Sequence, residues 1–137
     1  MKPVGLDTSV VVVGFLSARG SPGALLEAFF SDRLQLAFSG EVLAEYAEVL
    51  ARPKFAAVIT PADRAAFILK LHVAGFRVEP AIVPAAKWPD PDDVPFVAAA
   101  LATDAKVVIT LNPRDFAPAA ALGVRIISPA AARAELF

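Results

Sequence analysis

The sequence predicts an α/β fold in which helices flank a mostly parallel sheet. Short apolar, strand-like segments recur at residues 4–6, 34–38, 77–83, 106–110 and 124–127. Longer segments between them carry helix start and stop signals. Strands that alternate with helices form βαβ units, and the strands of such units run parallel. Because the chain shows no internal repeat and no linker, we expect residues 1–137 to form a single domain.

Composition narrows the function classes. The chain is 57% hydrophobic, carries a net charge of −1, and contains no cysteine and one histidine, which excludes disulfides, thiolate metal sites and His-rich metal sites. No stretch approaches the roughly 20 apolar residues that a membrane span needs. Since the opening Met-Lys-Pro does not start a signal peptide, we expect a cytoplasmic protein. With no global basic field, a nucleic-acid partner would need a local patch.

The N-terminal elements are read from propensity and capping signals. Residues 4–6 form the first strand. Residues 8–16, with four consecutive valines, fit either a strand or a buried helix, and the pattern does not decide between them. Ser21 followed by proline predicts an N-cap for a helix that runs to about residue 30. Residues 34–38 form the second strand.

The next two helices have clearer signals. Ser39 and Gly40 begin a helix that the Arg52-Pro53 pair ends. Thr60 and Asp63 have the spacing of a capping box, and their helix runs to about Gly75.

The C-terminal half starts with a third strand at residues 77–83 and a proline-rich bend at residues 84–91. Asp92 or Asp93 caps an alanine-rich helix that ends near Asp104. Residues 106–110 form a continuous apolar run, as expected for a strand that is buried on both faces.

The remaining elements close the chain. After the turn at residues 112–113 comes a short helical piece, then a fifth strand at residues 124–127. Ser128 and Pro129 open a final helix.

Three acids follow or precede elements in a way that brings them to one edge of the sheet. Asp7 follows the first strand, Asp115 lies just past the fourth, and Asp93 starts a helix. The carboxyl ends of parallel strands meet at one edge, where ligands bind in such sheets. Asp7 is therefore either a tolerated edge acid or the first member of an acidic site, and Asp93 is either an N-cap or a second member.

A fourth acid lies on a helix. Glu41, Glu45, Glu48 and Arg52 fall at i, i+4, i+7 and i+11, on one face of the helix. Like charges four residues apart repel each other, and a cation would remove that repulsion. A solvated charged face is the alternative. Together the four acids would make a hard oxygen site suited to Mg²⁺ or Mn²⁺, which can polarise a phosphodiester and generate hydroxide from water.

In order along the chain, four segments resemble a PIN domain, and more narrowly the VapC-like toxin ribonucleases of bacterial toxin–antitoxin pairs. The segments are Leu6-Asp7-Thr8-Ser9, residues 43–55 ending in Arg-Pro-Lys-Phe, residues 90–96, and residues 108–116. The resemblance implies a three-layer α/β/α sandwich and Mg²⁺- or Mn²⁺-dependent cleavage of RNA. It also implies an antitoxin protein partner and a homodimer.

Site residues follow from the resemblance position by position. The metal-binding, catalytic acids correspond to Asp7, Glu45, Asp93 and Asp115. The supporting positions correspond to Thr8, Ser9, Asp90, Thr110 and Asn112. Cations near the expected active edge, read either as RNA contacts or as ordinary surface charge, are Arg19, Arg52, Lys54 and Arg114.

Three departures from the family pattern leave a second hypothesis open. Ser9 stands where the family usually has asparagine, Val94 where it often has an acid or amide, and Asn112 where many members have aspartate. They motivate a catalytically weakened PIN-fold module that binds proteins. A phosphatase with Asp7 as the aspartyl nucleophile is a third hypothesis, although Ser9 stands where such an enzyme needs a second aspartate.

Overall fold

The chain, described here from a computed structural model at residues 2–84 and 88–136, has a parallel sheet with its first strand in the middle. A bridge between Val4 and Leu36 joins the two groups of paired strands. The order across the sheet is β3 (Phe76–Arg77), β2 (Ala37–Phe38), β1 (Gly5–Leu6), β4 (Val107–Ile109) and β5 (Arg125–Ile127). Every pairing between these strands is parallel, as predicted.

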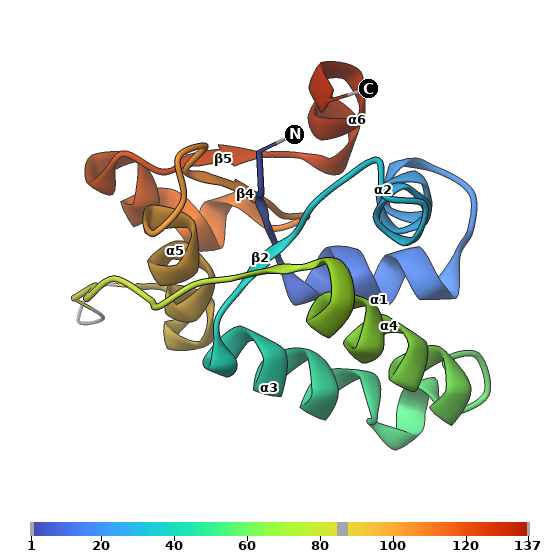
Figure 1. The fold of residues 1–137 in the computed structure, drawn as a ribbon. Coiled ribbons are helices and arrows are strands. Elements are labelled where there is room, and N and C mark those ends of the chain that lie inside the picture. Colours follow the sequence, from blue (N-terminus) through green and yellow to red (C-terminus); the bar gives the residue numbers. More distant parts are fainter. Residues whose placement is uncertain (1, 85–87, 137) are drawn as a thin grey trace.

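Helices cover both faces of this sheet (Figure 1). Their bounds are α1 (Thr8–Leu16), α2 (Ser21–Phe30), α3 (Gly40–Leu50), α4 (Pro61–Ala74), α5 (Val94–Leu101) and α6 (Pro129–Leu136). Three 3₁₀ segments complete the described elements: η1 (Pro53–Phe55), η2 (Pro91–Asp93) and η3 (Pro113–Leu122). In Figure 1, α5 and η3 lie on one side of the strands and α1, α2 and α4 on the other. The predicted α/β/α layering is confirmed.

The valine-rich segment after β1 is a helix, which settles the alternative that the sequence left open. Val10, Val11 and Val12 are buried, and only Val13 among the four valines is exposed. A helix that is apolar on nearly all sides is stable when it is buried. Here burial outweighs the slightly lower helix propensity of β-branched residues, which is below about 0.7 kcal/mol each.

Capping was predicted correctly at two helices and wrongly at a third. The Ser39 side chain accepts the Val42 amide at 3.3 Å, and Thr60 and Asp63 form the full capping box. Ser21, however, is the first residue of α2 and not its N-cap. Gly20 takes that place with φ 85°, a conformation that glycine adopts without steric cost.

The third strand is much shorter than predicted. It ends at Arg77, and Ala81 instead donates its amide to the Ala98 carbonyl at 3.0 Å. Pro80 has no amide hydrogen to contribute to a ladder, so the chain leaves the sheet before it. Part of the predicted bend that follows, residues 85–87, lies outside the described residues.

The helix after this bend is also shorter than expected and differently capped. Asp90, and not Asp92 or Asp93, supplies the capping oxygen, which accepts the Asp92 amide at 2.9 Å. The 3₁₀ turn η2 intervenes, and α5 ends at Leu101 instead of near Asp104. This leaves the Asp93 carboxylate without a capping bond to its own helix.

The core is continuous through both layers, and its largest fully buried side chains include Tyr46, Phe29, Phe67, Phe96 and Phe116. No single helix within the described residues is long and apolar enough to cross a membrane. One bent pair, α1 and α2, passes the same criterion jointly, but the two helices meet at 96° and contribute buried residues to the core.

Candidate active site

Asp7 lies at the carboxyl end of the central strand and is 5% exposed. Its amide donates to the Ile109 carbonyl of β4 at 2.9 Å, so the backbone is held where the strand ends. The Ser9 and Thr110 hydroxyls both donate to its Oδ2, at 2.7 and 2.8 Å. Burial raises the pKa of Asp7, while these two hydrogen bonds oppose the rise. The carboxylate is fixed in one orientation by hydroxyls and not by a cation.

Thr110 reaches Asp7 because β1 and β4 are neighbours in the sheet. Its side chain is fully buried and also accepts the Asn112 amide at 3.0 Å. Asn112 itself is exposed, and its backbone leads into η3. The structure thus places Thr110 on Asp7, and Asn112 takes part through its amide.

A groove of about 400 Å³ opens beside Asp7. It brings together side chains from α1, α3, η2 and the adjoining segments. The residues that line it are Thr8, Ser9, Val12, Val13, Glu45, Val49, Arg52, Asp90, Asp92 and Asp93. Five of the predicted site residues (Thr8, Ser9, Glu45, Asp90 and Asp93) and one predicted cation (Arg52) therefore share one cavity.

The carboxylates around this groove interact electrostatically. Burial, followed by the charge of Asp7, raises the pKa of Asp93 from 3.8 to about 7. Burial also raises the pKa of Glu45, with further contributions from Asp92 and Glu48, and Arg52 opposes the rise. Groups with perturbed pKa values in a cleft are candidates for function.

Asp115 takes part at longer range. It is half-buried at the start of η3 and does not line the groove. Its charge nonetheless contributes to the raised pKa values of both Asp7 and Asp93. Asp115 therefore lies on the same edge as the other acids but outside their cavity.

The predicted RNA-binding cations are dispersed. Arg52 lines the groove and lies 3.3 Å from Glu48. Lys54 lies 5.1 Å from the centre of the Phe55 ring, while Arg19 and Arg114 are exposed. None of these three lines the groove.

Two features of the site were not predicted as such. Asp92 lines the groove, although the sequence suggested for it only a capping role. The hydroxyl of Thr8 is buried and has no hydrogen-bond partner among the described residues. Asp92 could have been found from its place beside Asp93, whereas the unpaired hydroxyl depends on packing that the sequence does not reveal.

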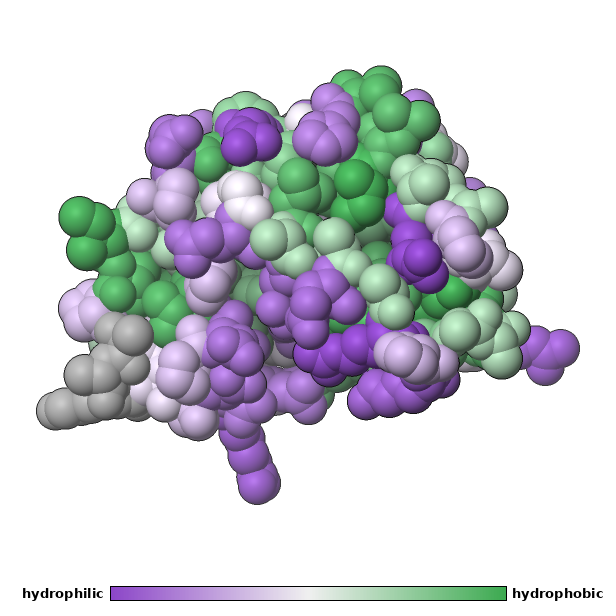
Figure 2. Space-filling model, turned by 90° about the horizontal axis from the view of Figure 1, so that it is seen from below, coloured by the Kyte–Doolittle hydropathy of each residue, from purple (hydrophilic) through white to green (hydrophobic). Residues whose placement is uncertain are grey.

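A second groove of about 450 Å³ lies along α3. It shares Glu45 and Asp92 with the first, and Glu41 and Glu48 add two further acids. Figure 2 views the molecule from the side of α3 and shows hydrophilic residues gathered around the middle of that face. The predicted glutamate stripe thus faces a hollow that continues from the first groove.

The donor chemistry of the site fits a hard divalent cation, because every charged candidate ligand offers a carboxylate and these carboxylates raise one another's pKa values. In the part of the chain that the structure describes, no three such groups are close enough to hold an ion as they stand. Glu45 and Asp93, at the groove surface, would have to approach Asp7, which is rigidly held.

Comparison with known proteins gives one match. A family model described as PIN domain matches residues 3–114, which include Asp7, Glu45 and Asp93. Searches of curated proteins and of solved structures found no match. PIN domains are generally nucleases, and the parallel sheet with its acidic carboxyl edge is consistent with that fold. The chain belongs to the PIN domain family.

Proposed function

We propose that this chain is a metal-dependent endoribonuclease that hydrolyses RNA phosphodiesters at the groove beside Asp7. The observation that supports this most strongly is the electrostatic coupling of Asp7 and Asp93, which raises the pKa of Asp93 to about 7. Carboxylates that destabilise one another in this way favour a bound cation.

Each residue has a distinct task in this proposal. Asp7, Glu45 and Asp93 would hold Mg²⁺ or Mn²⁺, with Asp115 adding negative charge nearby. When bound, the ion supplies a Lewis acid for the phosphodiester and lowers the pKa of a water. Ser9 and Thr110 orient Asp7 through hydrogen bonds of 2.7 and 2.8 Å.

The remaining groove residues bear on the substrate. Arg52 is the cation in the groove and is placed to attract a phosphate of the RNA. Asp90 holds the turn that presents Asp93, because its side chain accepts the Asp92 amide.

The biological role that we propose is that of a type II toxin in the cytoplasm, paired with an antitoxin protein and active as a homodimer. Its support is the resemblance of the four motif segments to VapC-like toxins, together with the PIN family match. Induced expression in a bacterium tests it. We expect growth arrest that disappears with Asp7→Asn, and normal growth with the wild-type chain would contradict the toxin role.

Purified protein and a mixed RNA substrate test the nuclease proposal. Cleavage should require Mg²⁺ or Mn²⁺ and stop with EDTA. Asp7→Asn and Asp93→Asn should each lower the rate roughly 10³-fold, which corresponds to the several kcal/mol that a metal ion contributes. An Asp104→Asn variant, at an exposed acid outside the groove, is the matched control and should cleave normally. Unchanged cleavage by both site variants would sink the mechanism.

A catalytically weakened protein-binding module is the second candidate. The observation that favours it is the wide spacing of the acids among the described residues. Val94 and Asn112, which offer no carboxylate, point the same way, but Ser9 does not, because its hydroxyl holds Asp7 well. For such a module, calorimetry should detect no Mn²⁺ binding, and growth arrest that depends on Asp7 would exclude it.

A further inference from the structure

We propose that Tyr46 is a positioning residue that sets the relative places of Asp7, Glu45 and Asp93. This inference rests on the proposed function, because it concerns how the same acids are brought into a metal-binding arrangement. Tyr46 is fully buried and does not line either groove, so it touches neither substrate nor metal.

The first link is to Asp7. The Tyr46 hydroxyl donates to the carbonyl oxygen of Leu6, the residue directly before Asp7. Val4, two residues earlier in the strand, bonds to the β2 segment through both its amide and its carbonyl. Because alternate residues of a strand point their backbone groups to the same side, Leu6 also faces that side.

At Leu6, however, the chain opposite has already turned into a helix. The bridge between β1 and the β2 segment is at Val4 and Leu36, and Ser39 is the N-cap of α3. The Tyr46 hydroxyl thus supplies the Leu6 carbonyl with a donor where the ladder has ended. A buried carbonyl without a donor would be costly, so the bond ties α3 to the end of β1.

The second and third links come from the same side chain. Tyr46 follows Glu45 directly in α3, so any shift of the ring moves the Glu45 backbone. Its ring centre lies 5.9 Å from that of Phe96, which stands three residues after Asp93. A further edge contact at 5.2 Å to Phe67 of α4 closes the other side of the ring. One tyrosine therefore contacts all three elements that carry the acids.

The test compares Tyr46→Phe with a control of similar stability. Tyr46→Phe keeps the aromatic contacts and removes only the hydroxyl. Leu25→Ala, in the buried face of α2 and away from both grooves, lowers stability without touching the link. For each EDTA-treated protein, calorimetry measures Mn²⁺ affinity, and urea denaturation measures stability.

We expect Tyr46→Phe to weaken Mn²⁺ binding roughly 10–100-fold, the usual effect of removing a group that orients ligands. Leu25→Ala should bind Mn²⁺ as the wild type does, even though it unfolds more readily. If Tyr46→Phe binds Mn²⁺ normally and loses only stability, Tyr46 is a core residue and the inference is wrong. If the wild type itself binds no Mn²⁺, the proposed function fails first, and the inference falls with it.

Discussion

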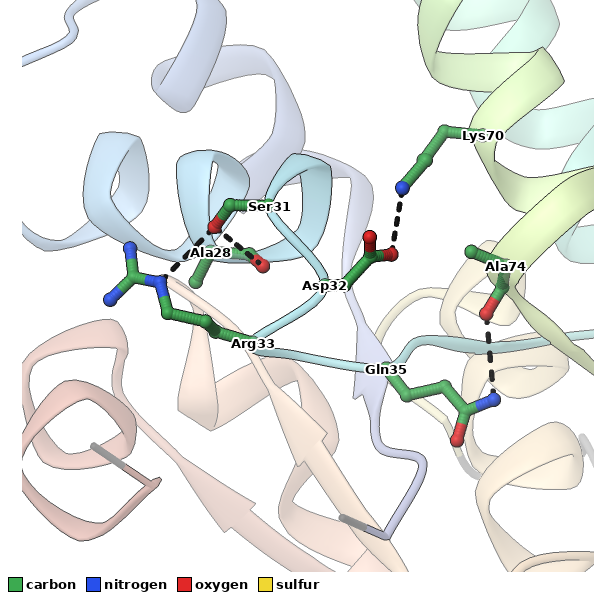
Figure 3. A network of polar contacts seen from close by, with 7 residues as sticks. All are labelled: Ala28, Ser31, Asp32, Arg33, Gln35, Lys70 and Ala74. Atoms are coloured by element: carbon green, nitrogen blue, oxygen red, sulfur yellow. Dashed lines mark hydrogen bonds and ion pairs between the residues drawn. The ribbon is translucent and has the colours of Figure 1, made fainter.

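Acids are treated in two different ways in this molecule. At the junction of α2, β2 and α4, Asp32 accepts a bond from Lys70 at 2.7 Å, as Figure 3 shows. Arg33 of the same junction pairs with Glu27. At the carboxyl edge of the sheet, Asp7 receives hydroxyls instead. None of the ion pairs found among the described residues includes Asp7, Glu45 or Asp93.

The pKa directions follow this difference. Far from the groove, the hydrogen bond from Arg125 lowers the pKa of Glu135. At the groove, burial and neighbouring acids raise the pKa values of Asp7, Glu45 and Asp93. The fold therefore gathers acids at one edge and holds them without cations. A buried carboxylate of this kind costs stability, so its presence indicates a ligand that completes the site.

Removing the hydroxyl that replaces a cation should have the largest effect on stability. Thr110→Val keeps the shape of the side chain but deletes its bonds to Asp7 and to the Asn112 amide. Leaving these groups unsatisfied should lower the free energy of unfolding by about 1–3 kcal/mol. Urea denaturation measures this, and Thr110→Ser, which keeps the hydroxyl, is the matched control. Equal losses in both variants would show that the methyl group and not the hydroxyl matters.

Changing the pH should separate the two regions. The pKa of Asp93 is about 7 in the folded protein and near 3.8 when unfolded, so the folded state binds more protons between these values. The free energy of unfolding of the metal-free protein should therefore fall as the pH rises through that window. Asp7 and Glu45 shift in the same direction.

Asp93→Asn isolates the contribution of this residue. In EDTA, the variant should lose less stability between pH 5 and pH 8 than the wild type does. Denaturation curves at the two pH values give the comparison, and parallel behaviour of the two proteins would show that Asp93 titrates normally.

The smallest effect is expected in the paired region. Asp32→Asn removes the bond partner of Lys70 on an acid that is 70% exposed, and asparagine tolerates its positive φ of 65°. The loss should stay below about 1 kcal/mol and shrink as salt is added. Thermal unfolding at low and high salt measures it. A loss as large as that of Thr110→Val would erase the distinction between the two regions.

Much of the architecture could be predicted because it depends on local signals. The capping box at Thr60 and the apolar run of β4 are encoded within a few residues, and both were found. The valine run of α1 could not be resolved, because strand propensity and burial compete there and only the tertiary fold decides. The third strand was predicted too long because the effect of Pro80 was underestimated.

The site shows the same division. The order of acids along the chain indicated the carboxyl edge, and the groove brings Glu45 and Asp93 together there. The hydroxyl of Thr110 on Asp7 follows from neighbouring strands. The link from Tyr46 to Leu6 could not be read from the sequence, because it joins residues 40 positions apart through a strand end that the sequence does not locate.

The most direct test of a cation site at the acidic edge is calorimetric titration of Mn²⁺ into EDTA-treated wild-type protein at pH 6 and pH 8. Since Asp93 must lose its proton to act as a ligand, saturable binding should tighten roughly tenfold between the two pH values. Asp93→Asn should bind weakly at both. Absence of saturable binding by the wild type at pH 8 would contradict the account.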